Sequence, residues 1–158
     1  MIRNSLRILS ISAALVFSAG CAMSAPRRAA QQVPQPPPVP TRADFLLSVP
    51  SELVLFDEGG FSLDAQDRAV LDAQAVWLQR NPGAAVTIEG HSDERGTRDY
   101  ALALADRRAN AVAAYLQSRG ISGSRMSVVS WGKERPVGLG SDELSWARNR
   151  RAVTLIQQ

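Results

Sequence analysis

The sequence predicts an α/β fold of the two-layer sandwich type, in which amphipathic helices cover one sheet. Strand and helix patterns alternate from about residue 43 to the end of the 158-residue chain. A stretch of this length suits one domain with a single hydrophobic core. The only cysteine, Cys21, lies before it. Since no disulfide can form within the chain, the core alone must hold the domain together.

Four segments of the domain have the pattern of strands and three have the period of helices. We expect strands at 52–56, 85–89, 126–131 and 150–157, and helices at 63–79, 98–118 and around 142–147. Ser62 can cap the first helix, with Asp64 in its first turn, and residues 81–83 stop it. Its buried face is expected to comprise Val70, Leu71, Ala75 and Leu78, flanked by Ala73 and Trp77.

The second strand is expected to end at Gly90, and residues 91–97 then read as a polar loop. The helix at 98–118 has a stripe of Ala101, Leu104, Arg108, Val112 and Tyr115, spaced by three and four, and Gly120 closes it. Arg108 therefore lies in the middle of the apolar face of the helix.

A guanidinium on an apolar helix face costs desolvation free energy unless an acid meets it. Asp93 is the nearest candidate in the preceding loop. Three arrangements stay open from the residues alone. Asp93 and Arg108 could form an internal ion pair, Arg108 could extend along its methylene stem to solvent, or the two charges could hold a small zwitterion.

Two blocks of the chain carry a resemblance to a known family. Residues 89–97 read Glu-Gly-His-Ser-Asp-Glu-Arg-Gly-Thr, and residues 104–109 read Leu-Ala-Asp-Arg-Arg-Ala. They resemble the peptidoglycan-associated lipoproteins, which belong to the family of the C-terminal domain of outer-membrane protein A. The similarity covers roughly Leu53 to Ile156 and includes further blocks at 80–82, 129–136 and 149–153. It implies a mixed four-stranded sheet packed against two main helices.

The resemblance also implies noncovalent binding of the peptidoglycan stem peptide through its meso-diaminopimelate residue. Asp93 would accept the ammonium of that residue, and Arg108 would hold its carboxylate through two parallel hydrogen bonds. Ala101 replaces an asparagine usual in the family, which removes side-chain hydrogen bonds. The binding residues that the resemblance implies are Asp93, Arg108, Arg95, Phe56, Asp57, Gly96 and Thr97.

The start of the chain has the features of a lipoprotein signal peptide. Arg3 and Arg7 precede an apolar run from 8 to 19, which is shorter than the roughly 20 residues of a membrane span. Ser18-Ala19-Gly20-Cys21 resembles a lipobox, so we expect a signal peptide at 1–20 and lipidation of Cys21. The alternative is ordinary secretion with cleavage after Ser24. A proline-rich linker follows at 21–42, and the binding domain occupies 43–158.

The resemblance implies an outer-membrane lipoprotein, lipid-anchored with its domain in the periplasm, which tethers the outer membrane to peptidoglycan. The Tol proteins TolB and TolA, of the Tol/Pal envelope and cell-division system, are the protein partners that it implies. The alternative is a periplasmic adaptor that acts mainly through protein partners.

Composition favours neither nucleic acid binding nor catalysis. Without Arg3 and Arg7 the chain has 16 basic and 15 acidic residues, so its charge predicts no nucleic acid partner. His91 is the only histidine, and a zinc site normally needs three or four well-spaced ligands. Ser92 beside His91 gives no complete set of nucleophile, base and oxyanion site. We therefore expect no enzyme, no metal and no cofactor.

Overall fold

The computed structural model describes residues 40–157. The predicted signal peptide, Cys21 and most of the linker lie outside the described residues. Four helices, one 3₁₀ turn and four strands follow one another along this part of the chain. In order, they are α1 Arg42–Ser48, β1 Leu53–Leu55, α2 Ala65–Arg80, β2 Val86–His91, α3 Arg98–Ser118, η1 Gly123–Arg125, β3 Met126–Gly132, α4 Glu143–Asn149 and β4 Arg151–Ile156.

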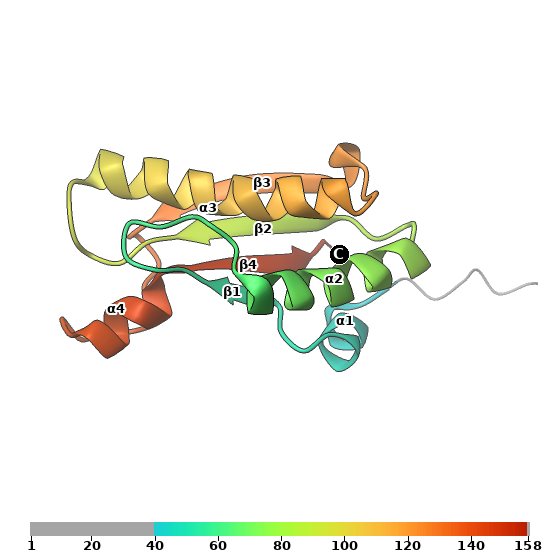
Figure 1. Ribbon diagram of the computed structural model, residues 1–158, viewed down its shortest axis with the longest axis horizontal. Helices are drawn as coiled ribbons and strands as arrows, with labels where there is room; N and C mark the ends of the chain where they lie inside the picture. Colours follow the sequence, from blue (N-terminus) through green and yellow to red (C-terminus); the bar gives the residue numbers. More distant parts are fainter. Residues whose placement is uncertain (1–39, 158) are drawn as a thin grey trace, which may run out of the picture. The chain divides into compact units, whose positions relative to one another are not determined.

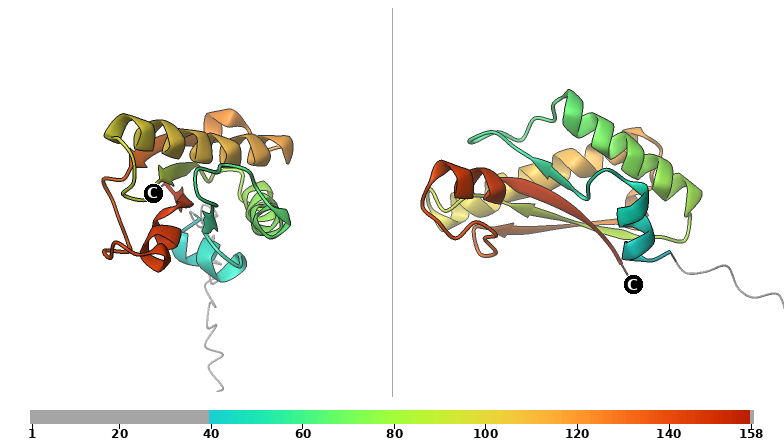
Figure 2. Two further views of the ribbon diagram at one scale, coloured as in Figure 1. Left: turned by 60° about the vertical axis from the view of Figure 1, so that its left-hand side comes forward. Right: turned by 90° about the horizontal axis from the view of Figure 1, so that it is seen from below.

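The four strands form one mixed sheet in the order β1-β4-β2-β3. β4 is antiparallel to both of its neighbours, whereas β2 and β3 are parallel and joined through α3. Figure 1 shows α3 running along β2 and β3, with α2 beside it toward β1. Helices α1 and α4 lie near opposite ends of the sheet (Figure 1; Figure 2, right). The predicted sandwich of a mixed four-stranded sheet and two main helices is confirmed.

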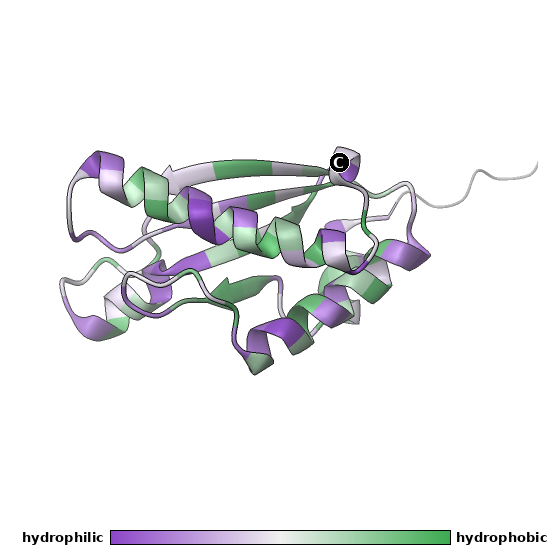
Figure 3. Cartoon of the chain, turned by 45° about the horizontal axis from the view of Figure 1, so that its top comes forward, coloured by the Kyte–Doolittle hydropathy of each residue, from purple (hydrophilic) through white to green (hydrophobic). Residues whose placement is uncertain are grey.

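The core lies between the sheet and the two long helices. Both helices alternate between hydrophilic and hydrophobic along their length, as amphipathic helices do (Figure 3). From α2, Leu71 and Leu78 are almost completely buried, and Leu116 of α3 and Ile88 of β2 meet them in the same cluster. Removing this much apolar surface from water is the main term that stabilises a domain without a disulfide.

The long helix α3 has the predicted bounds, but its buried stripe differs at one end. Ala101, Leu104, Arg108 and Val112 are buried as expected. Leu116 is completely buried in place of Tyr115, which is half-buried. The hydroxyl of Tyr115 instead donates to Asp72 at 2.9 Å. An aromatic side chain with a polar tip can stay at the edge of a core in this way.

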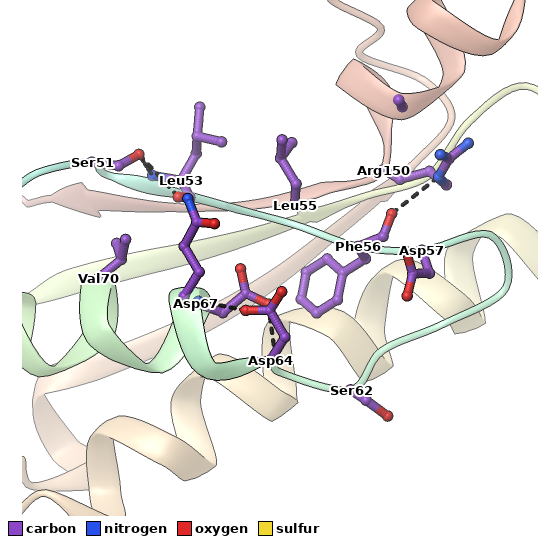
Figure 4. Close-up of a pocket in the computed structure, with 12 residues that line it drawn as sticks. Ser51, Leu53, Leu55, Phe56, Asp57, Ser62, Asp64, Asp67, Val70 and Arg150 are labelled. Carbon is purple, nitrogen blue, oxygen red and sulfur yellow. Dashed lines mark hydrogen bonds between the residues drawn. The ribbon is translucent and has the colours of Figure 1, made fainter.

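The first long helix begins later than predicted. The cap is Asp64 and not Ser62, because the carboxylate of Asp64 accepts from the backbone N–H of Asp67 at 2.8 Å. Asp67 in turn accepts from the N–H of Asp64 at 3.0 Å, which completes a capping box (Figure 4). Val70 and Ala73 of the predicted buried face are half-buried, whereas Trp77 is buried.

Helix α1 is not in the sequence prediction. Thr41 caps it, and Arg42 pairs with Glu52 at 2.6 Å, so the described fold starts before the predicted boundary at residue 43. Phe45 is fully buried and meets Trp77 edge to face, with ring centroids 5.0 Å apart. Residues before 43 therefore contribute to the domain.

The second strand continues past the glycine at which it was predicted to end. β2 runs to His91, and Gly90 pairs with Ala152 inside the sheet. A Cβ added at Gly90 would lie 1.9 Å from the carbonyl oxygen of Ala105 in α3. Glycine is needed here because helix and strand backbones approach closely.

No helix within residues 40–157 combines the length and the apolar character that crossing a membrane requires. In the same part of the chain, no three metal-binding side chains come together as a metal ion would need.

Candidate ligand site

The candidate site lies where β2 ends and α3 begins. The backbone N–H of Ser92 donates to the carbonyl of Gly132 at 2.8 Å, so the loop leaves the sheet beside the end of β3. Gly96 has a positive φ of 79°, which lets the chain turn back toward the helix. Thr97 then caps α3 by accepting from the N–H of Tyr100 at 3.2 Å. The loop is thus fixed at both ends.

A cavity of about 220 Å³ opens between this loop, the start of α3 and the turn after β1. Its lining includes Asp93, Arg95 and Gly96 among the predicted binding residues. Phe56 and Asp57 instead line a neighbouring groove between β1 and α2, shown in Figure 4. The other residues that line the cavity are Glu58, Gly59, Ser92, Tyr100, Ala101 and Leu104.

Asp93 is the buried acid of this cavity. It is 8% exposed, and its carboxylate accepts from the backbone N–H of Arg95 at 3.2 Å and from the Arg95 guanidinium at 2.6 Å. Arg150 approaches the same carboxylate to 3.6 Å. Burial by itself would raise the pKa of Asp93, but these hydrogen bonds and positive charges outweigh it and lower the pKa. Asp93 is therefore ionised at neutral pH.

Two of the three open arrangements of Arg108 do not occur, namely the extension to solvent and the direct ion pair with Asp93. Its side chain is completely buried, so it does not extend to solvent. Its guanidinium donates to three backbone carbonyls, those of Gly60 at 2.8 Å, His91 at 2.9 Å and Asp57 at 3.0 Å. A hydrogen-bonded pair with Asp93, the ion-pair alternative, is not among the contacts of Arg108 within residues 40–157, and Arg108 does not line the cavity.

The carbonyl contacts give Arg108 a structural effect on the site. They join the turn at 57–60 to the end of β2, and the turn forms one wall of the cavity. Burial lowers the pKa of Arg108 to about 10, and the charge of Asp93 opposes this shift. The guanidinium is thus still charged at neutral pH and adds positive potential behind Asp93.

Arg95 is the guanidinium at the cavity surface. Besides Asp93, it contacts Glu58 at 2.9 Å and lies over the ring of Trp146 at 4.4 Å from the centroid. The hydrogen bond with Asp93 raises the pKa of Arg95. Arg95 therefore bridges the loop after β2, the turn after β1 and helix α4.

Two residues that the sequence did not indicate hold the same loop. Lys133 donates to the carbonyls of Glu94 at 2.9 Å and Gly96 at 2.7 Å. The indole N–H of Trp146 donates to the Glu94 carboxylate at 3.0 Å. Lys133 belongs to the block at 129–136 that carried part of the family resemblance, but no spacing rule connects it to a loop that precedes it by 37 residues.

His91 and Ser92 are neighbours in the chain, but their side chains do not hydrogen-bond to each other. It is 2% exposed, and its Nε2 lies 3.7 Å from the Glu89 carboxylate. Burial and the charges of Arg151 and Arg135 lower its pKa to about 4, so the ring is neutral at pH 7. Within the described residues, neither ring nitrogen hydrogen-bonds to the Ser92 hydroxyl. A nucleophile and base pair is not formed between these two side chains.

Comparison with known proteins places the chain in a family. A model of the OmpA family matches residues 55–150, which is more than half of the chain. The chain belongs to the OmpA family. The matched region includes every predicted binding residue, so the site described above is part of the family domain.

The similar proteins agree with this assignment. A peptidoglycan-associated lipoprotein of Rhizobium meliloti (strain 1021) is 48% identical over 116 residues, covering 73% of this chain and 65% of that protein. One of Agrobacterium fabrum (strain C58 / ATCC 33970) is 46% identical over 116 residues, with the same coverage. The chain therefore spans about 65% of the length of these relatives. The family resemblance read from the motif is confirmed.

Solved structures show the same fold. The crystal structure of the peptidoglycan-associated lipoprotein from Burkholderia pseudomallei is 44% identical, with a TM-score of 0.66, covering 67% of this chain and 90% of that one. The C-terminal domain of Helicobacter pylori MotB (residues 125–256) is 17% identical with a TM-score of 0.61, covering 66% of this chain and 82% of that one. At that identity the second likeness shows the fold alone.

Proposed function

We propose that this chain is an outer-membrane lipoprotein that binds peptidoglycan noncovalently and so tethers the outer membrane to the cell wall. Family membership and the names of the relatives support a role at the envelope. The observation that carries the proposal is the cavity beside Asp93, in which an ionised carboxylate lies next to the partly exposed guanidinium of Arg95. This pairing of charges suits a zwitterionic ligand and a binding role.

The ligand in this proposal is the meso-diaminopimelate residue of the stem peptide. Its ammonium would bind Asp93, whose two oxygens offer about four acceptor positions, of which Arg95 uses two. Its carboxylate would bind guanidinium N–H groups of Arg95 and Arg108. Arg108 engages three of its five N–H groups with backbone carbonyls. Phe56, Asp57 and Thr97 would act by shaping the walls and the loop.

The membrane end of the proposal rests on Cys21. Cleavage after residue 20 would leave Cys21 at the N-terminus for acylation, and residues 21–42 would connect it to the domain in the periplasm. Each buried methylene of an acyl chain contributes about 0.8 kcal/mol, so two or three chains anchor stably where one is marginal. Many anchored copies on a repeating polymer add avidity to weak single contacts.

The protein partners in this proposal are the Tol proteins TolB and TolA. The adaptor alternative makes a different prediction, because a chain that acts only through protein partners should not bind purified cell wall.

Cosedimentation with purified sacculi tests the proposal. Asp93→Asn keeps the shape of the side chain and removes the charge, so it should leave the protein in the supernatant while the wild type pellets. Asp106→Asn is the matched control, because Asp106 is an exposed acid of α3 outside the cavity. Pelleting of Asp93→Asn to the wild-type extent would remove Asp93 from the proposed site, whereas failure of the wild type itself to pellet would favour the adaptor.

A further inference from the structure

Glu58 and Asp93 approach the same guanidinium from two sides of the cavity. Nη1 of Arg95 lies 2.9 Å from the Glu58 carboxylate, and Nη2 lies 2.6 Å from the Asp93 carboxylate. Glu58 comes from the turn after β1 and Asp93 from the loop after β2, and both line the cavity. Arg95 therefore spans the cavity in the protein without ligand.

The two acids that contact Arg95 differ in how far they are exposed to solvent. The side chain of Asp93 is 11% exposed, whereas that of Glu58 is 71% exposed. Stacking on Trp146 further restrains the Arg95 guanidinium. An exposed ion pair contributes little stability and its partners exchange readily with solvent and ions. Glu58 is thus the partner of Arg95 that an entering anion can replace.

A carboxylate that enters the cavity meets Arg95 before Arg108. Arg108 is completely buried and engaged with backbone carbonyls, while the side chain of Arg95 is 32% exposed and lines the cavity. The planar guanidinium of Arg95 offers the geometry that a carboxylate prefers. The position that Glu58 occupies on Arg95 is therefore one that a ligand carboxylate could take.

We propose that Glu58 is an internal competitor for the carboxylate of the ligand: it occupies Arg95 in the free protein and is displaced on binding. This inference rests on the proposed function. The diaminopimelate side chain carries both an ammonium and a carboxylate, whereas lysine carries the ammonium alone. Only the diaminopimelate peptide has to displace Glu58, so Glu58 weakens the binding of that peptide and leaves any binding of the lysine peptide unchanged.

Calorimetric titration of the full chain tests this competition. Glu58→Gln removes the charge and keeps the size, and Glu58 is exposed, so the fold does not depend on it. We expect Glu58→Gln to bind a diaminopimelate stem peptide about two- to fivefold more tightly than the wild type, the range that an exposed ion pair allows. Its binding to the matching lysine peptide should not change.

The control is Glu134→Gln. Glu134 is also exposed and pairs with an arginine, Arg98, at the same distance of 2.9 Å, but it lies outside the cavity lining. This variant should bind both peptides as the wild type does, which excludes a general effect of net charge.

Three results would overturn the inference. Equal affinity of Glu58→Gln and wild type for the diaminopimelate peptide would show that Glu58 does not compete. Weaker binding of both peptides would make Glu58 a direct contact of the ammonium. If the wild type bound neither peptide, the proposed function would fail and this inference with it, whereas the first two results leave the proposed function standing.

Discussion

Arg108 and Asp93 lie at the same end of the sheet but bind different partners. Asp93 accepts hydrogen bonds from Arg95, and Arg108 donates to the carbonyls of Asp57, Gly60 and His91. The two charges influence each other through space, since Asp93 raises the pKa that burial lowers at Arg108. Asp93 thus lines the cavity, while Arg108 hydrogen-bonds to the turn that forms one of its walls.

Replacing Arg108 should therefore destabilise the fold. Arg108→Ala leaves three backbone carbonyls without their donor, and we expect the free energy of unfolding to fall by about 3 kcal/mol or more. Urea unfolding followed by circular dichroism measures this. Arg107→Ala, the exposed neighbour, should change it by no more than about 0.5 kcal/mol. Equal small changes in both variants would contradict the structural role of Arg108. Because Arg108→Ala is expected to destabilise the fold, binding tests should use Asp93 variants instead.

The partners of Arg108 show what the sequence could not give. The bounds of α3 and the buried position of Arg108 follow from a local period of three and four residues. Its acceptors are backbone carbonyls 17, 48 and 51 residues earlier in the chain, and every residue type has such a group. A sequence distinguishes residues by their side chains and not by their backbone carbonyls. It therefore indicated the charged side chain of Asp93 as the partner of Arg108.

Gly90 should tolerate no side chain. In Gly90→Ala the new Cβ would lie 1.9 Å from the Ala105 carbonyl oxygen, so either α3 or β2 has to move. We expect a loss of more than about 3 kcal/mol in the free energy of unfolding, or no folded protein. Gly83→Ala is the matched control, because a Cβ there has no neighbour within 4 Å. Comparable stability of the two variants would show that the helix and strand are farther apart than described.

His91 should make stability depend on pH. Its pKa is about 4 in the folded protein, below the ordinary 6.5, so the unfolded chain binds a proton more readily. The stability that the neutral His91 ring contributes is fully present above pH 6.5, and it is lost as the pH falls toward 4. Between pH 7.5 and 5 we expect the wild type to lose on the order of 1 to 2 kcal/mol more than His91→Phe. Parallel pH profiles from urea unfolding would refute a buried neutral histidine.

Lys133 should support binding without touching the ligand. Lys133→Met removes two hydrogen bonds to the carbonyls of Glu94 and Gly96, which loosens the loop that carries Asp93. We expect affinity for the diaminopimelate peptide to fall about fivefold, or about 1 kcal/mol. Lys133→Arg keeps a donor and should recover part of it. Arg98→Met, which removes an exposed charge outside the cavity, should not change the affinity.

The residues that hydrogen-bond to the loop at 91–97 from other elements were harder to predict than those that line the cavity. Asp93, Arg95 and Gly96 lie in one contiguous motif, and the structure places all three at the cavity. Lys133, directly after β3, and Trp146 of α4 contact the same loop, across separations of 37 and 52 residues in the chain. Helix α1 was not predicted because its seven residues have only one buried apolar side chain, which is too few to show the helical spacing of apolar residues.

Calorimetric titration of the full chain and its Asp93→Asn variant with a diaminopimelate stem peptide tests the central claim most directly. The account predicts measurable binding by the wild type, much weaker binding of the lysine peptide, and loss of binding in Asp93→Asn with the fold retained. Binding of the same strength by wild type and a well-folded Asp93→Asn protein would contradict it.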